Sequence, residues 1–237
     1  MQGGGRPVAG VVDGDRTTPS TRAETMTHPT TTVPRQGGRR PLLPLEDAGR
    51  ASLFTDARTA NRFTDEPVSD AELAELWELA RWAPTSANTQ PLRVLFVRTD
   101  EGRARLAPHM ADGNRARVEG APAVAVLAVD RRFHDRIPEV MPPMAGLRDV
   151  LEADPERREG MAGFSAAMQA GYVVLAARAV GLGAGPLAGF DADGVDAELF
   201  AGTSWHAMLV VTLGHPDEGS YRPRMPRLAA EDVVRWA

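Results

Sequence analysis

Apolar and polar residues alternate along the chain with two periods, one typical of helices and one typical of strands. A helix is predicted over residues 69–83, because apolar side chains recur there at three- and four-residue spacing: Leu73, Leu76, Trp77, Ala80 and Ala83. Ser69 and Glu72 fit a capping box at its start, and Pro84 cannot continue its hydrogen-bond ladder. The pattern therefore fixes both ends of this helix.

The remaining apolar segments predict further helices and buried strands in alternation. Runs rich in β-branched and aromatic residues predict buried strands at 93–98, 123–129 and 205–214, and another strand is expected after the Gly-rich turn at 181. Helices are predicted at 45–61, 99–109, 165–180 and 191–201, whereas prolines break the pattern between 131 and 163. No repeat is present, so the class is α/β or α+β.

The N-terminal segment differs in composition from the rest. Residues 1–44 are rich in Gly, Thr, Pro and Arg and contain few large apolar side chains, so they are expected to form a disordered extension, with Met26 as an alternative start. Residues 45–237 are expected to form one folded domain.

Charge and residue usage exclude several classes of function. The net charge of -5 provides no basic field for nucleic acid, and the arginines at 103, 105, 115 and 117 are interpreted as solvated helix faces. The chain has no cysteine, and its five histidines show no metal-chelating spacing, so no metal site is expected. The apolar helix at 165–180 is too short to span a bilayer, so no membrane partner is expected, and the absence of cysteine is compatible with the cytoplasm as the default location.

Residues 84–91 form a polar segment between two prolines, where the 69–83 helix gives way to a strand. Its side chains offer hydrogen bonds suited to ring carbonyl and imide groups: Thr85, Ser86, Asn88 and Gln90. The alternative is an ordinary turn, in which these side chains satisfy their own backbone.

Other segments carry groups suited to a flat, phosphorylated ligand. Arg58, Arg222 and Arg224 offer forked donors for a phosphate, and the last two would point to the same side of an extended segment. Gly185 and Gly189 would let backbone amides approach a ring edge. Taken singly, each group is better explained in an ordinary way, the arginines as surface charge and the glycines as turn residues.

Taken together, and in this order along the chain, these segments resemble the nitroreductase family of FMN enzymes. The matching segments run from about residue 45 to the C-terminus: Arg58-Thr59-Ala60-Asn61-Arg62-Phe63, Ala83 to Pro91, Gly185 to Asp191, and Arg222-Pro223-Arg224-Met225-Pro226. Details of the first, third and fourth segments resemble the branch containing malonic semialdehyde reductase of pyrimidine degradation. Ala57 and Asn61 depart from the family pattern, which often has cationic residues there.

The resemblance implies an α+β fold, a mixed sheet flanked by helices, and an intertwined homodimer with one FMN at each interface. Arg58, Thr59 and Asn61 would lie near the flavin phosphate and ring, together with Arg222 and Arg224. The partner subunit would supply its 84–90 segment, and the segment after 185 would border the flavin N5. The cofactor-binding residues implied in these two segments are Pro84, Thr85, Ser86, Asn88, Gln90, Pro186, Leu187, Ala188 and Gly189.

The function implied is an FMN-dependent NAD(P)H oxidoreductase that passes hydride through the flavin to a small acceptor. Malonic semialdehyde, reduced to 3-hydroxypropanoate, is the acceptor that the branch resemblance suggests, and NADH and NADPH are both open as co-substrate. No catalytic side chain is required, because the cofactor carries the chemistry. Residues 131–163 would cover the substrate pocket. The alternatives are a nitroaromatic or quinone reductase, a flavin-dependent dehydrogenase of secondary metabolism, and an FMN-binding protein without turnover.

Overall fold

The computed structural model describes Met1 and residues 43–237, so nearly all of the predicted N-terminal extension lies outside the described residues. Pro44 to Ala237 form one compact unit. The proposed domain boundary between 44 and 45 stays a prediction.

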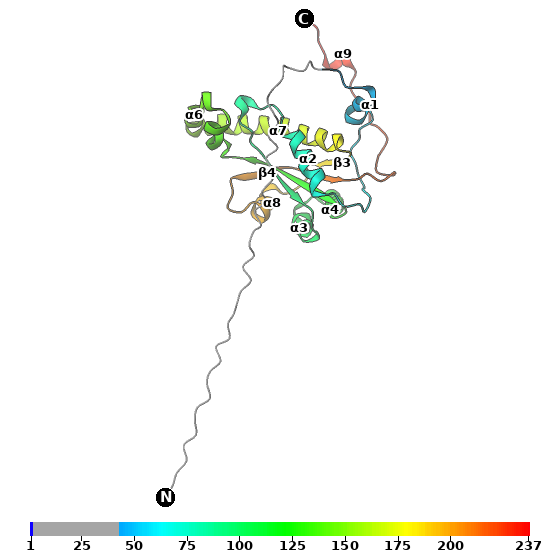
Figure 1. Cartoon of the computed structure of the whole chain (residues 1–237), viewed down its shortest axis with the longest axis horizontal. Coiled ribbons are helices and arrows are strands. Elements are labelled where there is room, and N and C mark those ends of the chain that lie inside the picture. Colours follow the sequence, from blue (N-terminus) through cyan, green and yellow to red (C-terminus); the bar gives the residue numbers. More distant parts are fainter. Residues whose placement is uncertain (2–42) are drawn as a thin grey trace. The chain divides into compact units, whose positions relative to one another are not determined.

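A four-stranded sheet in the order β1-β2-β4-β3 forms the centre of this unit (Figure 1). The strands are β1 (Leu92–Val97), β2 (Ala123–Asp130), β3 (Gly183–Leu187) and β4 (Trp205–Gly214). The α+β class is confirmed, but the three pairings are all antiparallel, so the expected mixture of parallel and antiparallel strands is absent from these four. After β1, and again after β3, the chain returns to the sheet at the end where the strand finished. The next strand therefore runs antiparallel to it.

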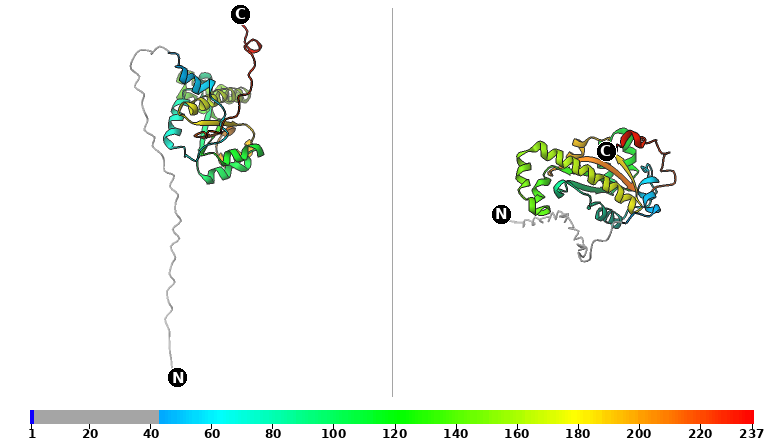
Figure 2. Two further views of the ribbon diagram at one scale, coloured as in Figure 1. Left: turned by 90° about the vertical axis from the view of Figure 1, so that its right-hand side faces the viewer. Right: turned by 90° about the horizontal axis from the view of Figure 1, so that it is seen from above.

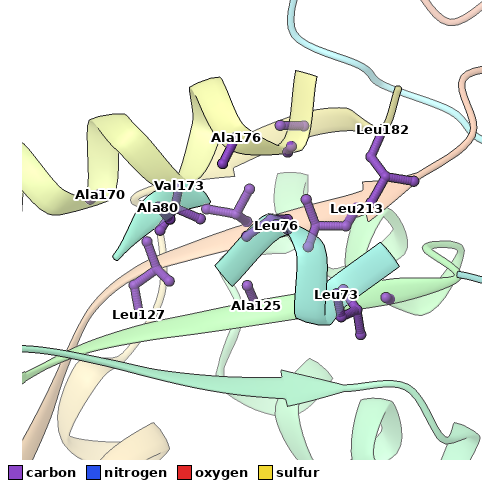
Figure 3. Packing of buried hydrophobic residues seen from close by; sticks show 14 of the residues in the cluster. Leu73, Leu76, Ala80, Ala125, Leu127, Ala170, Val173, Ala176, Leu182 and Leu213 are labelled. Atoms are coloured by element: carbon purple, nitrogen blue, oxygen red, sulfur yellow. The ribbon is translucent and has the colours of Figure 1, made fainter. Parts of the chain in front are cut away.

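One face of the sheet is covered by α2 (Asp70–Ala80) and α7 (Pro155–Ala179). Because side chains alternate along a strand, Ala125 and Leu127 of β2 point to this face, where Leu76 of α2 and Val173 of α7 pack on them (Figure 3). The predicted capping box is confirmed: the Glu72 N–H donates to the Ser69 hydroxyl at 3.2 Å, and the Ser69 N–H donates to the Glu72 carboxylate at 2.8 Å.

The opposite face is covered by α3 (Asp100–Leu106), α4 (Asp112–Glu119) and α8 (Ala192–Leu199). Val124 and Val126 of β2 point to this side and pack with Val118 and Val195. The sequence pattern did not predict α4, because Val118 is its only buried side chain and it therefore shows little apolar periodicity.

Residues 131–154, expected to be irregular, fold into short helical segments. These are η4 (Phe133–Arg136), α5 (Ile137–Val140), η5 (Pro142–Met144) and α6 (Leu147–Ala153), which pack around a separate apolar cluster. Their prolines were read as breaks in regular structure, but Pro138, Pro142 and Pro155 occupy first turns, where a missing N–H costs no helical hydrogen bond. For the same reason α7 begins ten residues before its predicted start at 165.

The first predicted helix is shorter than expected. It consists of α1 (Asp47–Arg50) and a π-helical turn, η1 (Ala51–Thr55), and it does not continue to residue 61. The following residues run beside β3 instead, where the Ala60 N–H donates to the Ala184 carbonyl at 3.1 Å. Backbone groups here are satisfied by the sheet edge rather than by a helical ladder. Near the C-terminus lies one short helix, α9 (Ala230–Val233).

Among the described residues, α7 is the one helix long and apolar enough to cross a membrane by length and composition. It lies across the sheet in the views of Figure 2, and 44% of its most apolar window is buried within the fold. Its apolar character is accounted for in part by this packing against the sheet and α2.

Candidate functional site

Five arginines gather around the end of the unit where β3, the 53–61 segment and the C-terminal segment meet. No carboxylate in the described part of the chain forms an ion pair with any of them: Arg58, Arg117, Arg178, Arg222 and Arg224. Most other arginines of the folded unit pair with Asp or Glu. A cluster of unneutralised guanidinium groups is an electrostatic environment suited to a phosphate or another anion.

Arg117 lies beside Gly185 of β3. Its Nη2 atom donates to the Ala60 carbonyl at 3.4 Å, while its buried Nε atom has no hydrogen-bond partner among the described residues. Burial lowers the pKa of the Arg117 guanidinium, and the nearby charge of Arg222 lowers the pKa further. The interpretation of Arg117 as part of a solvated helix face is therefore wrong, because α4 turns this side chain toward β3.

Arg178 and Arg224 hold the 53–57 segment against the end of α7. The Arg178 Nη1 atom donates to the Leu53 carbonyl at 2.8 Å, and Arg224 Nη2 donates to the Ala57 carbonyl at 2.9 Å and to Thr55. Burial lowers the pKa of Arg178, which Arg224 lowers further. The sequence predicts that Arg222 and Arg224 act as a pair. In the structure Arg222 lies near Arg117, whereas Arg224 lies near Arg178.

A small cavity of about 110 Å³ lies in this region, lined by Arg58, Arg178, Tyr221 and part of β3. It is smaller than the 300–1,000 Å³ or so typical of ligand pockets. Arg58 is half-buried and donates to the Asp56 carbonyl at 2.7 Å. The single chain thus offers a cationic surface here rather than a closed pocket.

Thr59 and Asn61 lie on the same segment but differ in what they contact. Thr59 is exposed. The side-chain amide of Asn61 donates to the carbonyls of Thr59 and Ser220, both at 3.1 Å. Asn61 therefore joins this segment to the C-terminal segment that carries the two arginines.

The end of β3 and the two residues after it present mainly backbone. Pro186, Ala188 and Gly189 are exposed, but Leu187 is buried, so only its main chain is available to a ligand. The Gly189 carbonyl accepts from the Asn114 side chain at 3.0 Å and from the Ala111 N–H at 3.1 Å. These bonds fix the loop against the start of α4.

The role expected for Gly185 is different from the one observed. A Cβ atom at this position would lie 2.4 Å from the Thr212 hydroxyl and 2.8 Å from the Ala60 carbonyl. The glycine is needed for close packing inside the fold, and it does not expose its amide to a ligand.

The polar 84–91 segment forms a strained loop with a short 3-10 turn, η2 (Ser86–Asn88). Ala87, Asn88 and Gln90 have positive φ angles of 48°, 53° and 46°. Left-handed backbone costs an L-residue roughly 1 kcal/mol or more, and such residues cluster at functional sites. Asn88 tolerates this conformation, as asparagine often does in turns, whereas Ala87 and Gln90 rarely adopt it.

Hydrogen bonds to α7 and α5 and within the segment hold this loop. The Ser86 N–H donates to the Ser165 hydroxyl of α7 at 3.2 Å, and the Asn88 amide donates to the Val140 carbonyl of α5 at 2.7 Å. Within the loop, the Gln90 N–H donates to the Thr85 hydroxyl at 3.2 Å. Pro84 is exposed at its entrance.

Within one chain, the loop and the arginine cluster lie far apart. The loop is bound to α7 at Ser165 and the cluster lies at Arg178, and thirteen residues of helix correspond to about 20 Å. Figure 1 shows α6 near one end of α7 and α1 near the other. The structure does not bring the predicted site residues of this chain into a single pocket.

Two groups of potential metal ligands are present, although no spacing motif predicted them. The first group consists of His134, Asp135 and Glu152. Both of its carboxylates are already paired with arginines. The second is Asp193, Asp196 and His206, which is partly exposed on α8 and β4. Neither group lies among the site residues discussed above.

Three residues of this region are not predicted from the sequence pattern: Arg117, Arg178 and Asn114. Arg178 is the single charged residue within an apolar helical stretch, and that isolation was a usable signal. Nothing in the local sequence distinguishes Arg117 from the solvated Arg115, because only the orientation of α4 separates them.

Comparisons with known proteins bear on the whole folded unit. A model of the nitroreductase family matches residues 55–215. A Streptomyces coelicolor protein, named as a candidate NADH dehydrogenase/NAD(P)H nitroreductase, is 55% identical over 200 residues, covering 84% of this chain and 98% of the relative. A Leptothrix cholodnii protein of the same description is 51% identical, covering 74% of this chain and 89% of the relative.

Solved structures share the fold at lower identity. A nitroreductase family protein from Streptococcus pneumoniae has a TM-score of 0.70 and 23% identity, covering 78% of this chain and 98% of its own. A candidate nitroreductase from Exiguobacterium sibiricum, solved in complex with FMN, has a TM-score of 0.69 and 21% identity, covering 78% of this chain and 96% of its own.

Proposed function

Because this chain belongs to the nitroreductase family, we propose that it is an FMN-dependent NAD(P)H oxidoreductase. The observation that carries the proposal is the cluster of five arginines that have no ion-pair partner among the described residues. Arg117 is the strongest member, because it is half-buried beside Arg222 and its Nε atom lacks a partner. A phosphate or an electron-rich ring edge would neutralise these charges.

The residues present fit FMN. Arg58, Arg222 and Arg224 would hold the phosphate, with Thr59 nearby as a further hydrogen-bonding side chain. Asn61 would act less directly, because its amide nitrogen already bonds the Ser220 carbonyl. The exposed main chain of residues 186–189 would border the reactive edge of the ring.

Bound FMN supplies an electron-accepting ring that takes hydride from NAD(P)H and passes it to an acceptor in a second half-reaction. The protein binds and orients these molecules and excludes water, and no side-chain acid or base is assigned. The Asn114 bond to Gly189 would keep the loop beside the ring in place during both half-reactions.

A homodimer is part of the proposal. The 84–90 loop carries strained backbone and polar groups, yet it lies about 20 Å along α7 from the arginine cluster of its own chain. In the proposed assembly Pro84, Thr85, Ser86, Asn88 and Gln90 serve the FMN held mainly by the other subunit. The separation of the two half-sites supports this arrangement.

The acceptor that we propose is a small aldehyde such as malonic semialdehyde, which gains hydride at its carbonyl carbon and a proton at its oxygen to give 3-hydroxypropanoate. A nitroaromatic or quinone reductase is the second candidate, favoured by the names of the close relatives. A flavin-dependent dehydrogenase and a flavin-binding protein without turnover are the remaining alternatives, and a cytoplasmic location is assumed for all of them.

Purification of the full chain tests the cofactor. A yellow protein whose colour is bleached by NADH or NADPH under nitrogen is expected. Arg222→Ala is the sharpest variant, because Arg222 makes none of the hydrogen bonds or ion pairs found among the described residues, whereas Arg224 also supports Ala57. Loss of a charge-assisted bond to phosphate should weaken FMN binding roughly 10- to 100-fold. Arg235→Ala, at the exposed C-terminus, is the matched control.

Each failure has a separate meaning. A colourless protein that does not bind added FMN would overturn the cofactor assignment. A yellow protein that neither nicotinamide bleaches would favour the binding-only alternative. Unchanged FMN affinity in Arg222→Ala would remove this residue from the site without affecting the family assignment.

A further inference from the structure

A second and larger cavity, of about 650 Å³, lies between the 84–91 loop and the helical segments η4 and α5. We call it the insert cavity. Thr89 and Gln90 line one wall, and Arg136 and Glu139 line the opposite wall. Its volume falls within the range of roughly 300–1,000 Å³ that is typical of small-molecule sites.

The floor of the insert cavity is a neutralised ion pair. Arg93 Nη2 donates to Asp130 at 2.6 Å, and the Ser204 hydroxyl donates to the other Asp130 oxygen at 2.6 Å. Arg93 Nη1 also donates to the Gln90 and Leu92 carbonyls. These partners occupy both groups, so the floor supplies a rigid polar surface and no free charge for a ligand.

Most charges of the helical wall are also committed. Arg132 donates to Asp135 at 2.7 Å and to Glu152 at 3.1 Å, while Arg148 donates to Asp135 at 3.1 Å. The guanidinium groups accordingly lower the pKa of the Asp135 carboxyl. Neither Arg132 nor Asp135 can turn to a ligand without breaking this network.

Arg136 is the exception. Its partner is Glu139, one helical turn further on at 2.7 Å, and the two side chains are 61% and 63% exposed. An exposed pair of this kind contributes about 0–1 kcal/mol, so a ligand anion can replace Glu139 at little cost. Arg136 is therefore the cation lining the insert cavity that can exchange its carboxylate partner for a ligand anion.

The other lining groups favour a polar ligand. Val140 is the single aliphatic residue among those that line the insert cavity. The Thr89 side chain is fully buried and offers no accessible hydroxyl, so the polar groups that a ligand meets are those of Gln90, Ser204 and the charged lining residues. An apolar aromatic molecule would bury these groups without satisfying them.

The insert cavity is connected to the proposed flavin half-site. Gln90 belongs to both, and its amide nitrogen donates to the Asn88 carbonyl oxygen at 3.1 Å. Asn88 in turn donates to Val140 in the cavity wall at 2.7 Å. A molecule in this cavity would thus lie beside the loop that is proposed to contact the flavin.

From these observations we infer that the insert cavity binds the carboxylate end of a small acidic acceptor, with Arg136 as the specificity-determining residue. The inference rests on the proposed oxidoreductase function. It assigns the recognition of the acid group to Arg136, with the reducible end of the acceptor directed toward the 84–91 loop.

Matched aromatic probes test this assignment: para-nitrobenzoate carries the carboxylate, and para-nitrobenzamide is its neutral analogue. Calorimetric titration of the FMN-loaded full chain, without nicotinamide, should show tighter binding of the benzoate by about tenfold. Arg136→Gln should abolish this preference and leave the affinity for the benzamide unchanged. Arg136→Lys should restore part of the preference, because it retains the charge without the fork. In turnover the same variants should change KM for the benzoate and leave kcat unchanged.

Arg157→Gln is the control, because Arg157 is an exposed arginine on the first turn of α7 that lies outside the cavity lining. It should behave as the wild type with both probes. Equal affinities of the wild type for the two probes, or an equal loss of both in Arg136→Gln, would overturn the inference. Titration and turnover together separate the two proposals: a protein that binds no FMN or shows no turnover contradicts the proposed function, whereas turnover without a carboxylate preference contradicts only the role of Arg136.

Discussion

The Ser86 N–H donates to the side chain of Ser165, a fully buried residue of α7, at 3.2 Å. This bond anchors the loop in which Ala87, Asn88 and Gln90 adopt left-handed backbone. Strain of this kind persists only where the surrounding structure holds it in place. The buried hydroxyl is one of the groups that keep the loop in the shape on which the proposed cofactor half-site depends.

Ser165→Ala should therefore loosen the loop. The loss of this bond should lower the free energy of unfolding by about 1 kcal/mol, because the Ser86 N–H loses its partner. The more informative effect is on FMN, whose dissociation constant should rise several-fold as the loop samples other conformations. Urea unfolding and flavin fluorescence titration measure the two quantities.

Ala74→Gly separates the two effects. Ala74 is exposed on α2, and glycine there should cost about 1 kcal/mol through helix propensity alone. Its FMN affinity should equal that of the wild type. If both variants lose the same amount of affinity, global destabilisation explains the result and the anchoring role of Ser165 is refuted.

A substitution of Arg117 should affect the stability of the apoprotein and its affinity for FMN differently. Arg117→Met keeps an apolar stem but removes a half-buried charge whose pKa is lowered by burial and by Arg222. The apoprotein should melt at the same temperature as the wild type or slightly higher, since the cost of burying the charge is removed. FMN should bind about tenfold or more weakly, because a cation facing the cofactor is lost.

Arg115→Met is the control for Arg117→Met. Arg115 lies two residues earlier on α4, is exposed, and forms only a long ion pair of 3.9 Å with Asp112. Its FMN affinity and melting temperature should both stay within error of the wild type. An apoprotein strongly destabilised by Arg117→Met would instead show that Arg117 is a structural residue.

The elements predicted best are those whose signal lies within a few neighbouring residues. The capping box at Ser69 and Glu72 is local chemistry, and the Ala/Val run of β2 needs only its own composition to be recognised as buried. The elements missed depend on distant partners. Ala57 continues the apolar spacing of the first helix, but the Ala60 N–H donates to Ala184 of β3 and the Asn61 N–H donates to Ser220, so the helix does not extend to residue 61.

The candidate site shows the same limit. The 84–91 segment is conspicuous as a polar run between prolines, but its left-handed residues follow from contacts with Ser165 and Val140, far along the chain. Arg117 and Arg115 have nearly the same sequence context. Only the packing of Val118 against the sheet decides which of them points to β3.

The main core can be tested with two leucines on one helix. Leu76 is fully buried between α2, α7 and the sheet (Figure 3), so Leu76→Ala should lower the free energy of unfolding by about 2–5 kcal/mol. Leu79→Ala changes a side chain that is 44% exposed and should cost less than about 1 kcal/mol. Equal losses in chemical denaturation would contradict the packing described for α2.

The start of α2 should make stability depend on pH through Glu72. Hydrogen bonds from the Ser69 hydroxyl and N–H lower the pKa of the Glu72 carboxyl below its usual 4.5, and His215 adds a smaller effect. A carboxyl whose pKa is lowered on folding stabilises the folded state above its unfolded pKa, and this contribution is lost as the pH falls through the folded value. The wild type should therefore be more stable than Glu72→Gln at pH 7, and urea denaturation should show this gap closing between about pH 5 and pH 3.

Glu75→Gln, one turn away and exposed, should show no such gap at either pH. A gap for Glu72→Gln that stays constant down to pH 3 would mean that the neutral amide, rather than the lost charge, causes the difference.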